Sequence, residues 1–366
     1  MSRSRLARAA SLVTARGLDA LLVTSLENLR YLSGFTGSDG ALLVSADGEG
    51  RFLTDSRYET QAAQETRDVS VTVYKRKLDG IVDAVKAAGV TRVGFEAAAV
   101  SVETADALRA QLAAVKTAAG GAVALEPVPS EVMAGLRMRK DAEELDLLRR
   151  AAAIAADSLA HTLALVKDGM REIDLALELE LAMRKRGAER LAFDTIVASG
   201  VRSALPHGRA SEKRLAEGEL LTIDYGARYN GYNSDETWTG VVGEPSAEQR
   251  RIFGIVKEAQ AAGIAAVRAG VKASEVDAAA RRVIDAAGYG RNFGHGTGHG
   301  IGLAVHEAPG VNTSGTVVLE PGMVITVEPG IYLPGWGGVR LEDMVVVTET
   351  GAEVITRTPK DLRSVG

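Results

Sequence analysis

The sequence has no cysteine, and only five of its 366 residues are histidine. The absence of cysteine excludes a disulfide framework and any metal site built on thiolates. A metal ion would therefore need carboxylate oxygens and imidazole nitrogens as its ligands. No stretch approaches the ~20 apolar residues of a membrane span, and the first residues lack the apolar core of a signal peptide. We therefore predict a cytoplasmic protein without a membrane partner.

The sequence also lacks a strong excess of one charge. Its 43 basic and 48 acidic residues give a formal net charge of −5. A surface that binds nucleic acid leaves a basic footprint, so we expect no nucleic-acid partner. The hydrophobic content of 46% is that of an ordinary globular protein. Because single cores rarely grow beyond about 250–300 residues, a chain of this length is expected to form two domains.

Two domains with different patterns are expected along the chain. Helical and strand-like segments alternate in the first part, which is typical of a compact α/β unit. Long helical passages follow, and beyond residue 190 the strands are longer and the turns richer in glycine. We predict a first domain over 1–130, a linker over 131–142 and a second domain over 143–366.

A hairpin that carries two aspartates is predicted in the second domain. Strand-like segments flank Asn230-Gly231, which is the strongest short-range signal for a two-residue hairpin turn. In that register Asp224 lies opposite Thr237. Asp235 is then the diagonal neighbour of Asp224, with Cα atoms roughly 7–8 Å apart. The two carboxylates either reach inward to a shared pair of metal ions or merely flank a surface hairpin.

A second pair of acidic residues follows a similar pattern. The apolar run Met323–Val327 ends on Glu328, and Glu342 precedes a return strand after a turn rich in glycine and proline. An ionised carboxylate beside a buried strand is costly, so it needs a cation or a bound proton. The connecting loop is too long to predict the register of this hairpin.

Histidines are concentrated in one glycine-rich segment. Three of the five lie within twelve residues, at His295, His299 and His306. The glycines disfavour a stable helix and let backbone and ligands approach closely. A lone histidine is more often structural, whereas three in one segment of a histidine-poor chain indicate a functional site.

Together these segments predict a site of four carboxylates and one histidine. Four clustered acids would repel one another and raise one another's pKa values. Two divalent cations cancel that charge, as they do in two-metal hydrolases. Oxygen-rich ligation with a single imidazole suits manganese, cobalt or zinc better than a soft metal.

These motifs resemble those of the pita-bread metallopeptidases, in particular the Xaa-Pro peptidases, aminopeptidase P and prolidase. The segment from His295 to Glu307 carries the signature of that subgroup, and Asp224 and Asp235 have the same eleven-residue separation. The other matching motifs are Thr-Val-Glu328-Pro-Gly and Arg340-Leu-Glu342-Asp343. The resemblance spans residues 143–358 and extends more loosely over the first domain. It implies an α+β fold, with a pita-bread catalytic domain preceded by a smaller α/β creatinase-type domain.

The resemblance also implies a set of metal ligands. Asp224 would bind one metal ion, while His299 and Glu328 bind the other. Asp235 and Glu342 would bridge the two ions, with manganese expected first and cobalt or zinc as alternatives. Glu328 would also take the proton of the attacking water and pass it to the leaving proline nitrogen.

Four further residues are implied in catalysis. His207, His295 and His306 would hold the substrate carbonyl and the proline end. Arg340 would orient the bridging acids or meet a substrate carboxylate. One position departs from the family, because Trp238 stands where arginine is usual. Tryptophan offers one neutral donor in place of a charged five-donor fork, which puts local support of the site in doubt.

The implied activity is hydrolysis of the bond between the N-terminal residue of a peptide and a following proline. An aminopeptidase P accepts longer peptides, whereas a prolidase is restricted to dipeptides, and the first domain favours aminopeptidase P. A methionine aminopeptidase would lack this first domain and the full histidine signature, and a creatinase-type enzyme would have lost the ligands. The alternative from another functional class is a binding protein that has the pita-bread fold but no catalytic activity. Proline-containing peptides are the expected partners, and a homodimer is expected by resemblance.

Overall fold

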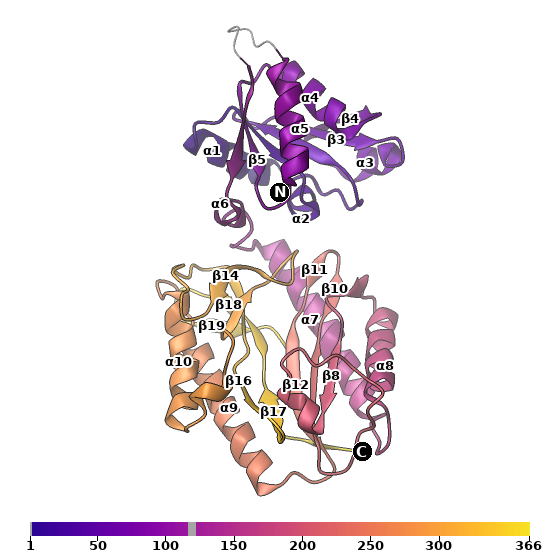
Figure 1. The fold of residues 1–366 in the computed structure, drawn as a ribbon, viewed down its shortest axis with the longest axis vertical. Coiled ribbons are helices and arrows are strands. Elements are labelled where there is room, and N and C mark those ends of the chain that lie inside the picture. The colour runs from indigo at the N-terminus through magenta and orange to yellow at the C-terminus, as the bar shows by residue number, and fades with distance from the viewer. Residues whose placement is uncertain (1, 116–121) are drawn as a thin grey trace. The chain divides into compact units, whose positions relative to one another are not determined.

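The chain folds into two compact units in the computed structural model, which describes residues 2–115 and 122–366. The units are Met1–Arg137 and Met138–Gly366, and each is described by itself (Figure 1). The division falls within 131–142, the segment expected as a linker. Within the described ranges, none of the helices combines the length and the apolar character that a membrane span requires.

The first unit is built around a six-stranded sheet in the order β4-β3-β2-β1-β5-β6. The strands β1, β2 and β3 pair antiparallel, whereas β3–β4, β1–β5 and β5–β6 pair parallel. The strands are β1 (Ala20–Val23), β2 (Ala41–Ser45), β3 (Gly50–Asp55), β4 (Val69–Tyr74), β5 (Arg92–Glu96) and β6 (Ala124–Val128). The helices are α1 (Ser2–Ala15), α2 (Leu26–Ser33), α3 (Glu59–Glu65), α4 (Lys77–Ala88), α5 (Val102–Ala113) and α6 (Ser130–Ala134). The apolar strand β1 is fully buried, and Ile81 of α4 and Leu108 of α5 pack into the same core.

Two pairs of helices flank the strands of the second unit. In Figure 1, α8 lies on one side of the strands, and α9 and α10 lie on the other. The helices are α7 (Ala142–Leu163), α8 (Glu172–Lys185), α9 (Ala247–Ala266) and α10 (Ala273–Ala286). Helix α7 begins at a capping box, in which Asp141 and Glu144 each accept a backbone N–H of the other.

The strands of the second unit form two principal sheets. One has the order β20-β12-β9-β8, and the other has the order β14-β13-β15-β18-β19. The strands of the first are β8 (Ile196–Ser199), β9 (Leu220–Tyr225), β12 (Glu236–Val242) and β20 (Ser364–Val365). The strands of the second are β13 (Gly298–Gly300), β14 (Glu307–Val311), β15 (Val324–Val327), β18 (Asp343–Val347) and β19 (Ala352–Val354). The smaller ladders comprise β7 (Arg190–Leu191), β10 (Ala227–Tyr229), β11 (Tyr232–Asn233), β16 (Gly330–Leu333) and β17 (Gly337–Arg340).

The predicted register of the first acidic hairpin is confirmed. Tyr229 pairs with Tyr232, and Asp224 lies opposite Thr237. Asn230 and Gly231 have φ angles of 44° and 83°. A type I′ turn requires positive φ at both central residues, and this pair supplies it. The hairpin therefore places the two aspartates on a diagonal, as the register demands.

The second hairpin is built from two successive ladders. Val327 pairs with Asp343 in the first ladder, and Gly330 pairs with Arg340 in the second. Glu328 and Glu342 lie at the junction between the two ladders. The junction places a carboxylate on each of the two chain segments at the same level of the hairpin.

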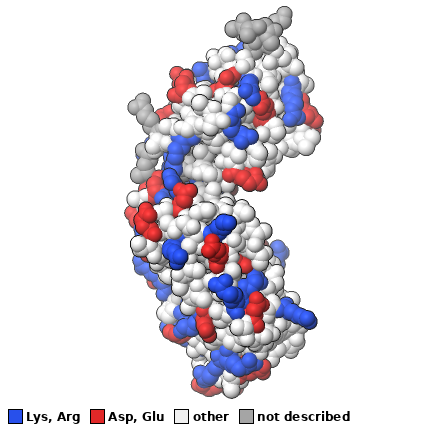
Figure 2. Space-filling view, turned by 90° about the vertical axis from the view of Figure 1, so that its left-hand side faces the viewer, with Lys and Arg blue, Asp and Glu red and all other residues white. Residues whose placement is uncertain are grey.

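Charged residues on the surface are of mixed sign. On the face in Figure 2, acidic and basic side chains are intermingled over the described residues. This face therefore does not carry the concentrated basic footprint of a nucleic-acid-binding surface.

Candidate metal centre

A cavity of about 550 Å³ in the second unit brings together every predicted site residue. It lies where the strands of the two principal sheets approach each other. The predicted metal ligands that line it are Asp224, Asp235, His299, Glu328 and Glu342. The other predicted residues that line it are His207, His295, His306 and Arg340. Residues from 207 to 342 thus contribute to one concave site.

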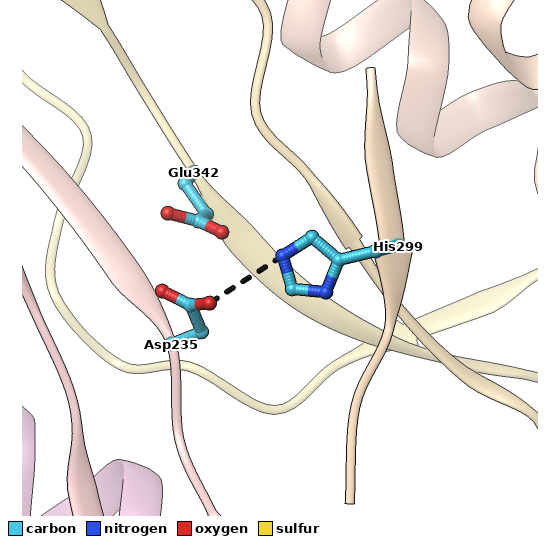
Figure 3. A group of neighbouring side chains, drawn as sticks. All are labelled: Asp235, His299 and Glu342. Atoms are coloured by element: carbon cyan, nitrogen blue, oxygen red, sulfur yellow. Dashed lines mark ion pairs between the residues drawn. The ribbon is translucent and has the colours of Figure 1, made fainter. Parts of the chain in front are cut away.

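Three of the proposed ligands are close enough to hold one metal ion. Asp235, His299 and Glu342 each present a ligand atom, and these atoms all lie within 4.8 Å of one another (Figure 3). Asp235 directly precedes β12, Glu342 directly precedes β18, and His299 is on β13. The Nε2 atom of His299 is 3.5 Å from Asp235 Oδ2 and 3.5 Å from Glu328 Oε1. Glu328 therefore adjoins this group of three.

Asp224 reaches the cavity beside the buried cation Arg340. Arg340 Nη2 donates to Asp224 Oδ2 at 2.6 Å, and the Arg340 side chain is only 4% exposed. The other carboxylate oxygen, Asp224 Oδ1, is buried and has no hydrogen-bond partner among the described residues. A buried carboxylate oxygen without a donor is costly. It is therefore suited to a cation that approaches from the cavity.

Three carboxylates of this cluster, Asp235, Glu328 and Glu342, hold protons more tightly than ordinary acids. Burial, followed by the charges of Asp224 and Glu328, raises the pKa of Asp235 well above its usual value. Burial raises the pKa of Glu328 to about 8, against the opposing effect of Arg340. Burial and the charge of Asp235 raise the pKa of Glu342 in the same way. Four carboxylates thus share a single buried guanidinium, and they lack the positive charge needed to ionise together.

His299 has the tautomer that a metal ligand needs. Its Nδ1 lies 3.0 Å from the carbonyl oxygen of Gly300, which can only accept a hydrogen bond. The proton is therefore on Nδ1, and the lone pair of Nε2 faces Asp235 and Glu328. Burial lowers the pKa of His299 to about 4, so the ring is neutral at physiological pH. Neutral imidazole is the form that binds metal ions.

The donor set fits divalent metal ions on these observations. It combines four carboxylates in need of positive charge, one imidazole with a free lone pair and one carboxylate oxygen without a donor. Hard and borderline divalent cations prefer such oxygen and imidazole ligands.

A hydrogen-bonded chain links Asp224 to His295. Arg340 Nη1 donates to the hydroxyl of Tyr332 at 2.9 Å, and that hydroxyl lies 2.8 Å from His295 Nε2. His295 Nδ1 faces the carbonyl oxygen of Gly296 at 2.8 Å, so Nδ1 donates and Nε2 accepts from Tyr332. Both ring nitrogens of His295 are thereby engaged, and burial lowers the pKa of this ring to about 4.

The two remaining predicted site histidines line the cavity in different ways. The ring of His306 packs against that of His299, with centroids 4.3 Å apart. His207 belongs to the loop after a short 3-10 helix (Gly200–Ala204). The loop is tied to the site through Arg340, whose Nη1 donates to the carbonyl oxygen of Pro206 at 3.1 Å.

Trp238 lies away from the cavity. Its side chain is 1% exposed and packs in the core with Leu179 of α8 and with Ile223 and Tyr225 of β9. Alternate residues of a strand face opposite sides, so Asp235 and Thr237 face the cavity while Trp238 faces the helices. The tryptophan therefore supports the sheet through apolar packing.

Two residues that hydrogen-bond to the predicted site residues, Thr237 and Tyr332, were not predicted from the sequence. Thr237 Oγ1 donates to Glu342 Oε2 at 2.7 Å and accepts from Arg340 Nε at 3.1 Å. Thr237 could have been found, because it lies two residues after Asp235 on the same face of the predicted strand. Tyr332 lies in the long connection whose register could not be predicted, so the pattern gave no signal for it.

Comparisons with known proteins agree with this geometry. Residues 146–349 match metallopeptidase family M24, and residues 5–138 match the creatinase/prolidase N-terminal domain. An uncharacterised peptidase of Bacillus subtilis is 44% identical over 347 residues, which cover 94% of this chain and 96% of that protein.

Solved structures are similar over nearly the whole chain. An Xaa-Pro dipeptidase from Bacillus anthracis is 41% identical, with a TM-score of 0.94 and coverage of 100% of both chains. An X-Pro aminopeptidase from Thermotoga maritima is 38% identical, with a TM-score of 0.88 and coverage of 98% of this chain and 100% of the other. The chain therefore belongs to metallopeptidase family M24, and its pita-bread catalytic domain follows a creatinase-type N-terminal domain, as predicted.

Proposed function

We propose that this protein uses two divalent metal ions to hydrolyse the peptide bond between an N-terminal residue and a following proline. The observation that carries the proposal is the convergence of Asp224, Asp235, His299, Glu328 and Glu342 on one cavity. The names of the Bacillus anthracis and Thermotoga maritima relatives support the choice of proline-containing peptides as substrates.

The five ligands would be shared between the ions as the resemblance implies. Asp224 would hold one ion, His299 and Glu328 would hold the other, and Asp235 and Glu342 would contribute to both. Divalent ions in such a site lower the pKa of water and polarise the substrate carbonyl. We propose manganese first, with cobalt or zinc as alternatives, because the donor set contains four carboxylates and one imidazole.

The protein's own residues would move one proton during the reaction. The carboxylate of Glu328 takes it from the attacking water and delivers it to the proline nitrogen as the peptide bond breaks. His207 and His306 would contact the substrate carbonyl and the proline end. His295 would act through its hydrogen bond with Tyr332, because both of its ring nitrogens are engaged.

We propose the aminopeptidase P type, which accepts peptides longer than two residues. The buried cation of the cavity, Arg340, already donates to Asp224, Tyr332 and Thr237. Together with the contact to the carbonyl oxygen of Pro206, these contacts use four of the five N–H groups of its guanidinium, so Arg340 is suited to orient the acids of the site. The alternative is a prolidase, which the likeness to the Bacillus anthracis dipeptidase favours. The homodimer and the cytoplasmic location stay predictions.

The test compares three peptides with the manganese-loaded protein. Release of glycine from Gly-Pro-Ala supports the aminopeptidase P type, and cleavage of Gly-Pro alone supports a prolidase. Gly-Ala-Ala should resist cleavage. Chelation should abolish turnover, and so should Asp235→Ala and Glu328→Ala, with circular dichroism unchanged. Glu244→Ala is the matched control, because Glu244 is 87% exposed in the same unit. Substantial activity of either purified site variant would refute the ligand assignment.

A further inference from the structure

A second polar cluster lies behind the proposed metal ligands. Successive residues of a strand face opposite sides, and Glu236 and Asp343 directly follow Asp235 and Glu342. Neither Glu236 nor Asp343 lines the cavity. Glu236 is 0% exposed and Asp343 is 6% exposed. Each proposed bridging ligand thus has an acidic neighbour that faces away from the site.

Lys360 joins these two acidic neighbours. Its Nζ lies 2.5 Å from Glu236 Oε1 and 3.3 Å from Asp343 Oδ1, and its side chain is 9% exposed. Burial alone would lower the pKa of Lys360, but the attraction of Glu236 and Asp343 outweighs it and raises the pKa above its usual value. A buried cation therefore bridges β12 and β18 from the side opposite the cavity.

The segment that carries Lys360 makes the same kind of contact at every second residue. Thr356 Oγ1 donates to Asp343 Oδ1 at 2.5 Å. The backbone N–H of Thr358 donates to Glu236 Oε1 at 3.1 Å, and its hydroxyl lies 2.8 Å from that of Tyr225. Tyr225 itself directly follows Asp224. The residue after each of three proposed ligands is thus held by this segment near the C-terminus.

The separation of the bridging ligands is constrained from both sides by these contacts. On the cavity side, Thr237 of β12 donates to Glu342. On the opposite side, Lys360 attracts Glu236 and Asp343 together. Without the ammonium group, the two buried carboxylates would lose their shared counter-charge, and β12 and β18 would lose the ion pairs that join them.

We propose that Lys360 is a positioning residue of the metal centre, which sets the separation of Asp235 and Glu342 by joining Glu236 to Asp343. The inference rests on the proposed function, because it takes Asp235 and Glu342 as bridging ligands. Partners that orient metal ligands typically change metal affinity by about 10- to 100-fold when removed. We expect an effect of this size at Lys360, although its ammonium touches no proposed ligand.

The test measures Mn²⁺ affinity of the full-length protein after removal of metal with a chelator. Titration calorimetry compares the wild type with Lys360→Met, which keeps an unbranched side chain one atom shorter and removes its charge. Lys257→Met is the matched control. Lys257 pairs with Asp361, the next residue of the same segment, but the two side chains are 49% and 67% exposed. We expect affinity about 10- to 100-fold weaker in Lys360→Met and unchanged in Lys257→Met.

The outcomes separate positioning from general stabilisation. A Lys360→Met protein that is folded by circular dichroism and binds Mn²⁺ as tightly as the wild type would overturn the inference, even with a lower melting temperature. If Lys360→Met fails to fold, the Mn²⁺ affinity of the double variant Lys360→Met/Glu236→Gln is compared with that of the wild type instead. This variant also lacks the ion pairs of Lys360, but it leaves only one buried carboxylate, that of Asp343, without its partner. Wild-type affinity in that variant would overturn the inference too. A wild type that binds no Mn²⁺ would refute the metal centre itself.

Discussion

Replacing Glu328 by glutamine should stabilise the metal-free catalytic unit at alkaline pH. The folded-state pKa of Glu328 is about 8, raised from 4.5 chiefly by burial. A carboxyl group with a raised pKa favours the folded state below pH 4.5, and this contribution is lost as the pH rises towards 8. Glutamine resembles the protonated acid in shape and does not titrate. The variant should therefore escape the destabilisation that ionisation of Glu328 imposes.

The magnitude follows from the two pKa values. Ionisation of a group with pKa 4.5 unfolded and about 8 folded destabilises the fold by about 1 kcal/mol at pH 5 and about 4 kcal/mol at pH 8. The side chain of Glu328 is 18% exposed, so solvent screening makes these figures upper limits. The advantage of Glu328→Gln over the wild type should thus grow by up to about 3 kcal/mol between these pH values.

A comparison of variants is needed because two histidines act in the opposite direction. Burial lowers the pKa values of His295 and His299 to about 4. Each contributes stability that is present above its unfolded pKa of about 6.5 and lost as the pH falls. Their effect offsets that of Glu328 in the wild-type curve, but it is common to both proteins. The difference between the wild type and Glu328→Gln therefore reports the carboxyl group of Glu328 together with its electrostatic coupling to Asp235 and Glu342.

The assay is urea unfolding in the presence of a chelator, followed by tryptophan fluorescence. Both tryptophans, Trp238 and Trp336, belong to the second unit, so their emission reports on that unit alone. Glu244→Gln is the control, because Glu244 is 87% exposed and its substitution should give a difference that does not change with pH. A Glu328→Gln protein whose advantage stays constant from pH 5 to pH 8, or reverses, would refute the reasoning.

Two further predictions concern residues outside the cavity. Trp238→Ala should destabilise the second unit by about 3–5 kcal/mol, because Trp238 is 1% exposed in the core. Urea unfolding followed by circular dichroism measures this loss. The folded variant should retain its Mn²⁺ affinity, and a loss of affinity would contradict a role confined to the core. Glu96→Gln should destabilise the first unit by about 2–3 kcal/mol, because Glu96 accepts the backbone N–H groups of Thr24 and Ser25 and an amide of Asn28. Hydrogen exchange across residues 20–33 should rise while Mn²⁺ affinity stays constant, and unchanged exchange would count against this network.

The first acidic hairpin could be predicted in detail because its determinants are local. A type I′ turn has two central residues with positive φ, and Asn-Gly is the pair that adopts this conformation at least cost. Once the turn is placed, a side-chain period of two assigns every residue of the ribbon to a face. The positions of Asp224, Asp235 and Thr237 all follow from that single turn.

The second hairpin could not be predicted in the same way. Glu328 and Glu342 are separated by a connection that forms its own ladder, β16 with β17. Its length allows several registers, and the contacts of Tyr332 with Arg340 and His295 depend on the one that is adopted. The tautomer of His299 likewise depends on the folded backbone, which places the carbonyl oxygen of Gly300 beside Nδ1.

Lys360 shows why a complete set of ligand motifs does not by itself determine a metal centre. The motifs specify which side chains reach the cavity, and strand alternation turns Glu236 and Asp343 to the opposite side. Their common partner lies 124 residues after Glu236, in a segment with no pattern that indicates a site. The spacing of the ligands therefore depends on a contact that is distant in sequence. Two chains with identical ligand motifs can therefore differ in metal affinity if their residues at position 360 differ. The wild type and Lys360→Met are such a pair.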